Sequence, residues 1–212
     1  MLANSIRRNR PLVLTGFVYT SLASTPVIPS NWPVGSLVFF VDNARSGNTT
    51  PPSLQIPTGF TQLASVTTNS ASTAIRDTLS YKILTAGDPG ATLSPVQTSN
   101  LLRYWLICYY PTSGRIGRVV FSTVNQQATT GTPANQTIGK TDFIPYYNLA
   151  IWRGDASLTA TGTNMTIVNH ANSTENRIGY YTSVDNTQTI VVTSNDSGTW
   201  TSMRSLSFTA FP

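Results

Sequence analysis

The chain has 212 residues, of which 40% are hydrophobic and only 10% are charged, and its formal net charge is +5. Charged residues make up about a quarter of an ordinary globular protein. Since helix surfaces usually carry Glu, Lys and Arg, this composition favours strands. Large apolar residues recur along the whole chain, which excludes extensive disorder, and no apolar run approaches the roughly 18 residues of a membrane span.

The first 11 residues form a polar, basic segment without periodicity, in which Arg7, Arg8 and Arg10 lie close together. Terminal segments of this kind are usually mobile, so we expect a flexible N-terminal arm over residues 1–11 and one domain over residues 12–212. The apolar residues after the arm resemble a signal peptide, but Pro11 opens the run and Gly16 interrupts it. We therefore predict a strand there rather than a cleaved leader.

Apolar runs between clusters of turn residues predict the strands of the first half. These runs are 12–19, 36–41, 60–67, 75–84 and 101–110. The segments between them are rich in Pro, Gly, Asn and Asp, residues that favour turns. The predicted turns and loops are 25–33, 42–52, 69–73 and 85–90.

The second half repeats the pattern. Its predicted strands are 119–124, 148–152, 165–168, 177–184, 189–193 and 200–211, with a loop at 125–133 and a tight turn at 195–198. About ten short strands bounded by turn residues are typical of a β-sandwich, a jelly roll or a barrel. The fold class is therefore all-β, and no linker divides the chain into two domains.

Candidate catalytic groups are few. His170 is the sole histidine, so a metal site built on two or three imidazoles is impossible, and no Gly-x-Ser-x-Gly elbow accompanies it. The acidic residues are Asp42, Asp77, Asp88, Asp142, Asp155, Asp185, Asp196 and Glu175. Most lie beside Gly, Asn or Pro, which favours turn roles over paired carboxylates for glycoside cleavage. A calcium site at 42–43, 185–186 or 195–196 is the alternative, but we expect no catalytic residue, no cofactor and no metal.

Cys108 is the only cysteine, so the chain has no internal disulfide. Its apolar surroundings at 104–109 predict a buried, inert thiol. Adjacent tyrosines occur at 109–110, 146–147 and 180–181. On a strand, one residue of each pair can face outwards, where a Tyr can stack on a sugar or anchor an interface; the alternative is that core, loops or a neighbouring subunit cover both.

The basic residues form two groups, the arm and a second group of Arg103, Arg115 and Arg118. A solvated surface and an acidic partner are both compatible with them, whereas no motif indicates sequence-specific nucleic-acid binding. The glycine–arginine segment 114–118 is read as an exposed hairpin tip.

An ordered series of short segments carries a family resemblance. The first segment, 34–39, leads into a strand, and the second, 56–61, contains a Pro-x-Gly turn. The third, 80–89, has a Tyr-Lys strand followed by a Pro turn, and the fourth is the closing strand 200–208. The series resembles a group of tailed-bacteriophage virion proteins with jelly-roll-like domains. Ser36 stands where Asp is typical of the group, and Phe60 where Trp is typical. The resemblance implies a jelly-roll-like antiparallel β-sandwich and a place in the virion, and it supplies no catalytic residue.

We therefore expect a non-enzymatic structural protein on the surface of a bacteriophage virion, assembled in the host cytoplasm, either as capsid decoration (cement) or as a head–tail accessory. Its partners would be capsid or tail subunits and further copies of itself. Arg7, Arg8 and Arg10 are the expected partner-binding residues, because guanidinium groups form paired hydrogen bonds with carboxylates. The alternative is a receptor-binding tail adhesin that recognises host-surface glycans, and a glycan-cleaving enzyme is a third.

Overall fold

The computed structural model describes residues 12–21, 25–46, 50–53, 56–69, 74–94, 103–130, 136–138, 141, 146–154, 158–161, 179–184, 188–194 and 200–212. Regular structure in these residues consists of strands: β1 (Leu12–Ser21), β2 (Leu37–Ser46), β3 (Thr61–Asn69), β4 (Ala74–Ile83), β5 (Arg103–Pro111), β6 (Arg118–Phe121), β7 (Asn125–Thr130), β8 (Gln136–Ile138), β9 (Tyr147–Gly154), β10 (Leu158–Thr161), β11 (Gly179–Val184), β12 (Gln188–Ser194) and β13 (Trp200–Phe211). In this part of the chain no helix is long and apolar enough to cross a membrane.

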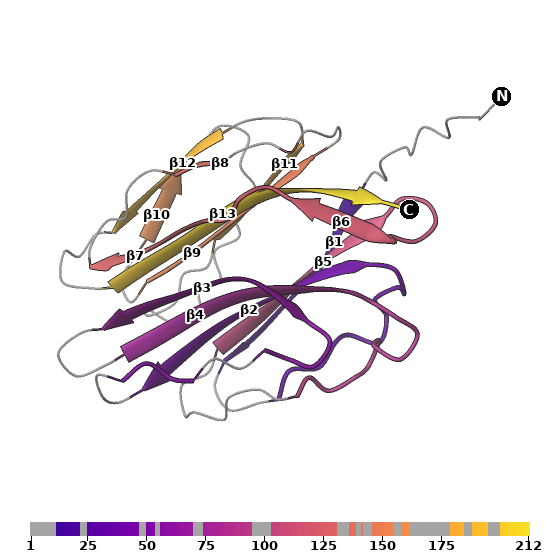
Figure 1. Cartoon of the computed structure of the whole chain (residues 1–212), viewed down its shortest axis with the longest axis horizontal. Coiled ribbons are helices and arrows are strands. Elements are labelled where there is room, and N and C mark those ends of the chain that lie inside the picture. The colour runs from indigo at the N-terminus through magenta and orange to yellow at the C-terminus, as the bar shows by residue number, and fades with distance from the viewer. Residues whose placement is uncertain are drawn as a thin grey trace.

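Two antiparallel sheets pack face to face as a β-sandwich (Figure 1). The first has the strand order β1-β5-β2-β4-β3, and the second has the order β11-β9-β13-β6, with β7 also pairing with β13. A small sheet, β10-β12-β8, contacts β9 and β13 of the second sheet. Each large sheet comes from one half of the chain, since the strands of the first lie within 12–111 and those of the second within 118–211.

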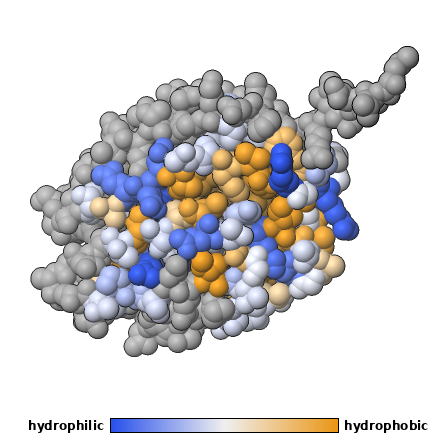
Figure 2. All heavy atoms as spheres, in the orientation of Figure 1, coloured by the Kyte–Doolittle hydropathy of each residue, from blue (hydrophilic) through white to orange (hydrophobic). Residues whose placement is uncertain are grey.

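The main core lies between the two sheets and follows the two-residue period of the strands. Its largest contributions are Leu37, Phe39 and Val41 of β2, Trp105, Ile107 and Tyr109 of β5, Leu149 and Ile151 of β9, and Leu206 and Phe208 of β13. The Phe208 ring centre lies 5.2 Å from that of Phe39 and 5.0 Å from that of Tyr109, both edge-on. Half-buried apolar side chains pack around this interior, and Figure 2 shows apolar surface between the two layers.

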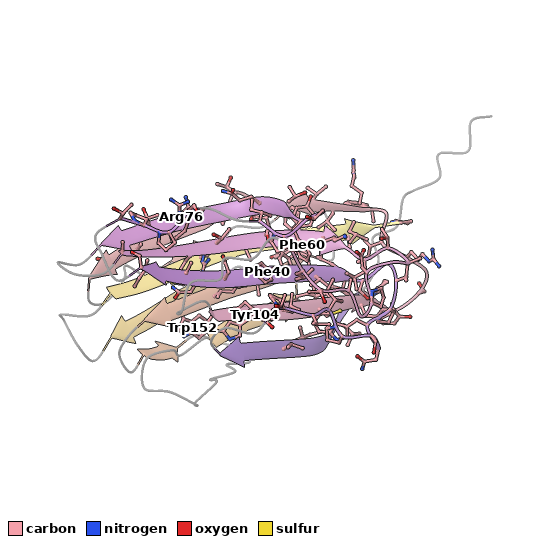
Figure 3. All side chains as sticks on the ribbon, turned by 90° about the horizontal axis from the view of Figure 1, so that it is seen from below. Phe40, Phe60, Arg76, Tyr104 and Trp152 are labelled. Atoms are coloured by element: carbon pink, nitrogen blue, oxygen red, sulfur yellow. The ribbon has the colours of Figure 1, made fainter. Side chains whose placement is uncertain are left out.

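The outer face of the first sheet is covered by loops, which creates a second core. Ile28, Trp32, Phe60, Leu84 and Leu93 come from the segments 25–36, 56–60 and 84–94 and pack on the sheet. On the sheet itself, Phe40 stacks on Tyr104 at 5.8 Å and meets Phe60 edge-on at 5.9 Å (Figure 3). Backbone hydrogen bonds such as Ile28 N–H to the Ala91 oxygen join these loops to one another. Most of the first sheet is therefore covered on both faces.

A β-bulge in β1 lies where the loop segment 25–36 packs on the outer face of the sheet. The register of β1 against β5 shifts between Leu14 and Gly16, and the Trp32 side chain lies directly over Gly16. A Cβ at Gly16 would come within 2.5 Å of the Trp32 Nε1 atom, closer than real Cβ contacts allow. Only glycine permits this approach of indole to backbone.

The predicted strands at 12–19, 60–67, 75–84, 101–110, 189–193 and 200–211 are confirmed in type and in approximate position. The predicted turn at 42–52 is wrong at its start, because β2 continues to Ser46 and pairs with β4 along its whole length. The predicted loop at 125–133 is wrong in the same way, since 125–130 form β7 and pair with β13. The predicted strand at 165–168 lies outside the described residues.

The segment 114–118 is exposed as predicted, apart from the buried Ile116, but the hairpin is wrong. It connects β5 of the first sheet to β6 of the second sheet, so it is a crossing between the two layers. Near β6 the backbone of this crossing is attached both to the segment before β2 and to β13. Ile116 N–H donates to the Gly35 oxygen at 3.2 Å, and Gly117 N–H donates to the Phe211 oxygen at 2.8 Å.

Candidate functional site

A buried polar cluster joins the two sheets at Asp77, whose side chain points into the interior from β4. Asn43 lies opposite it on β2 and donates from Nδ2 to Asp77 Oδ1 at 2.5 Å. Ser202 reaches it from β13 of the other sheet and donates from Oγ to Oδ2 at 2.5 Å. All three side chains are buried. The carboxylate therefore bridges its own sheet and the facing sheet by charge-assisted hydrogen bonds, the stronger class.

Arg204 follows Ser202 by two positions on β13, so it faces the same interior. Its side chain is 1% exposed, and within the described part of the chain none of its three guanidinium nitrogens has a hydrogen-bond partner. Burial lowers the pKa of Arg204, while the negative charges of Asp77 and Asp42 oppose that shift. Arginine nonetheless stays charged in proteins. The cluster therefore balances its charges at a distance rather than through a direct ion pair.

Asp42 lies one residue before Asn43, so it points to the opposite, loop-covered face of the sheet, across from Thr78. Burial raises the pKa of Asp42 to about 7. The neighbouring Thr78 and the charge of Arg204 act against this shift, and the charge of Asp77 adds to it. Asp42 therefore titrates near neutral pH, unlike an ordinary aspartate.

These carboxylates do not form a catalytic pair. Asp42 and Asp77 lie on opposite faces of one sheet, so they cannot flank one glycosidic bond as two cooperating carboxyl groups must. Both also lie within strands, so the turn predicted at Asp42 is wrong, whereas Asp77 lies in the strand predicted at 75–84. Within the described ranges no group of three or more His, Cys, Asp or Glu side chains could hold a metal.

Asp88 is the one acidic residue whose predicted turn role is confirmed. It accepts hydrogen bonds from the backbone N–H and Oγ1 of Thr85 at 2.6 and 2.7 Å, and Lys82 Nζ lies 2.5 Å from its Oδ1. Partial burial acts to raise the pKa of Asp88, but the hydrogen bonds from Lys82 and Thr85 outweigh it, and the net shift is downward. Asp88 therefore fixes the turn after β4.

Cys108 is fully buried, as predicted. Burial raises the pKa of its thiol to about 12, against a smaller opposing effect of the nearby Ser36 side chain. The thiolate is the reactive form, so this residue has no nucleophilic role at ordinary pH. The sole histidine, His170, lies outside the described residues.

The predicted partner-binding residues Arg7, Arg8 and Arg10 also lie outside the described residues. Of the second basic group, Arg115 and Arg118 are exposed. The Arg118 guanidinium carbon lies 5.0 Å from the centre of the Phe211 ring, a cation–π distance.

An exposed apolar pair lies on β1 and β5, which sequence reasoning located only in part. Val13 is 52% exposed, and Tyr110, which is directly opposite it in the β1–β5 register, is 37% exposed. Tyr109 is buried, so this tyrosine pair splits between the two faces, whereas Tyr146 and Tyr147 are both buried. Alternation along the strand allowed one residue of the 109–110 pair to face outwards, but nothing in the sequence indicated which one, or its pairing with Val13.

The comparisons with known proteins give no further guide. No family model, no curated protein and no solved structure matches the chain.

Proposed function

We propose that this chain is a non-enzymatic structural protein on the surface of a bacteriophage virion, of the capsid-decoration or head–tail accessory kind. The observation that carries the proposal is the structural use of buried polar groups. Asp77 links the two sheets through Asn43 and Ser202, and Asp88 fixes a turn with Lys82 and Thr85. These groups contribute to rigidity rather than to a cleft where chemistry could occur.

The segments that resemble phage virion proteins have architectural roles in this fold. Gly35 and Gly59 both have positive φ angles, of 85° and 81°, at the turns that lead into β2 and β3. The resembling segment 80–89 forms the end of β4 and the turn that Asp88 fixes. The resemblance is thus carried by turns and core, as expected for a family defined by its fold, and the jelly-roll detail of the resemblance stays a prediction.

A sheet covered on both faces suits a protein that must stay folded outside a cell. Both faces of the first sheet are packed, by the second sheet on one side and by loops on the other. Local opening of such a sheet exposes much apolar surface and is correspondingly rare. Attachment would then occur through surface contacts repeated by the symmetry of the particle.

The direct test is to locate the chain on purified particles of the phage that encodes it. Mass spectrometry of gradient-purified particles gives its copy number relative to the major capsid protein, and antibody labelling with electron microscopy gives its position. We expect a fixed copy number that survives repeated purification. Loss of the chain during purification, with its recovery in the soluble lysate, would overturn the proposal.

Tyr110 favours a second candidate, a tail adhesin that binds host glycans, because an exposed aromatic ring can stack on a sugar. A glycan array with the purified protein tests this alternative. Binding to a defined set of glycans that is lost in Tyr110→Ser would favour the adhesin, and an array without signal would exclude it.

A further inference from the structure

The Val13–Tyr110 pair lies on the first two strands in the order of the first sheet. Among the described strands β1 pairs with β5. The ten residues of β1 include neither a charged residue nor a proline. Natural edge strands usually carry such residues to prevent association. An apolar edge with an exposed valine and tyrosine is therefore a candidate interface.

Arg115 lies in the crossing that follows β5. Gly35 lies so close to the crossing that a Cβ on it would come 2.8 Å from Arg115 Cβ, and Ile116 N–H donates to the Gly35 oxygen. Gly35 in turn is two residues before Leu37, which pairs with Tyr109. An exposed cation is thus anchored at the end of β5 that carries Tyr110.

Among the residues that the structure describes, no exposed negative side chain balances that cation. Residues 1–41 and 89–141 contain no Asp or Glu, and they include β1, β5 and the crossing. The three acidic side chains in the described ranges, Asp42, Asp77 and Asp88, are all buried. Among the described residues, the exposed charge nearest this pair in the chain is therefore positive.

We propose that Val13, Tyr110 and Arg115 form a docking face for an acidic protein surface. The inference rests on the proposed function, since it names the face by which the chain would attach to the particle. An apolar centre with a basic margin matches a protein surface that has an apolar contact rimmed by carboxylates. A second copy fits poorly, because a two-fold contact would bring each face against the same cations. A phosphate backbone offers the apolar pair no counterpart.

The test uses particles of the encoding phage that lack the chain, to which the purified full-length protein is added back. We expect Tyr110→Ser to weaken attachment by about tenfold or more, as for an aromatic anchor. Arg115→Gln should weaken it by a few-fold and reduce its dependence on salt, since an exposed charge is screened. Because both side chains are exposed, the Tm of each variant should match that of the parent.

Two matched variants serve as controls. Val27→Ser changes another exposed valine, 44% exposed, in the loop cover, and Arg118→Gln changes an exposed arginine on the second sheet. Both should attach like the parent. Equal attachment of Tyr110→Ser and the parent, or equal loss in the controls, would overturn the docking face.

A photo-crosslinking amino acid at position 110 then identifies the partner on the particle. Crosslinking to a protein segment rich in Asp and Glu supports the proposal; crosslinking to a second copy, to nucleic acid or to nothing overturns it. These results are separable from failure of the proposed function. If the chain binds particles but fails these tests, only the docking face is wrong, whereas a chain that binds no particle also removes the virion role.

Discussion

Asp42 gives the sharpest test of the electrostatics inside this sandwich. In the folded protein burial raises its pKa from 3.8 to about 7, so the folded carboxyl keeps its proton over a range in which the unfolded chain has lost it. Below pH 4 both states are protonated, and above about pH 7 both are ionised. Between these limits the folded state binds more protons, so the free energy of unfolding falls as pH rises.

The size of this effect follows from the two pKa values. The change from 3.8 to about 7 corresponds to at most about 4 kcal/mol, because one pKa unit is worth about 1.36 kcal/mol. Asp42→Asn keeps the shape of the side chain but cannot ionise. Relative to the parent, the variant should therefore gain stability steadily between pH 4 and pH 7 and keep a constant advantage above that range.

Urea unfolding followed by tryptophan fluorescence, at fixed ionic strength from pH 4 to pH 8.5, measures this difference. Asp88→Asn is the matched control with the opposite sign, because the folded pKa of Asp88 is lowered. Its carboxylate stabilises the fold above the unfolded pKa and loses that effect as pH falls. Asp88→Asn should therefore be destabilised at pH 7 and approach the parent in acid. A difference between Asp42→Asn and the parent that does not change with pH would refute the reasoning.

Four further outcomes are expected, three from the structure and the last from the sequence of the arm. Ser202→Ala removes the donor to Asp77 from the facing sheet, and urea unfolding should show a loss of about 1–3 kcal/mol, the cost of an unsatisfied buried acceptor. Gly16→Ala places a Cβ against Trp32 and should lower the Tm by several degrees, by an overpacking cost of about 1–3 kcal/mol; an unchanged Tm would show that the indole can move aside. Cys108 should react with a thiol reagent only at the rate of unfolding, and rapid labelling of the native protein would show that β5 is accessible. Deletion of residues 2–10 should leave the Tm unchanged but weaken attachment to particles and reduce its salt dependence, and full attachment would show that the arm is no anchor.

The strands could be predicted wherever their signal is local. The apolar run that became β2 was recognised up to Val41, and prediction failed at Asp42 and Asn43 because these residues favour turns in isolation. What keeps them in a strand is the ladder to β4, where Asp77 accepts a hydrogen bond from Asn43. That partner is 34 residues away in the chain, and no local pattern reports it.

The candidate site could be predicted only in part for the same reason. Alternation placed one residue of the 109–110 pair outside, and Tyr110 is the exposed one. The same argument did not hold for 146–147, where the Tyr147 hydroxyl oxygen accepts a hydrogen bond from the Leu12 N–H of β1, 135 residues away. The opposition of Val13 to Tyr110 depends on the β1–β5 register, which the β-bulge at Leu14 and Gly16 shifts.

The division of the chain into two halves, one for each large sheet, has a consequence for folding. The strands within 12–111 can complete one sheet without borrowing a strand from the strands within 118–211. Yet neither half can bury its inner face alone, because the core residues of each are covered by the other. Hydrogen-bonded ladders can therefore form separately, while stability arises only when the layers dock. The short crossing at 112–117 keeps the two halves at high local concentration, so this docking is an intramolecular step.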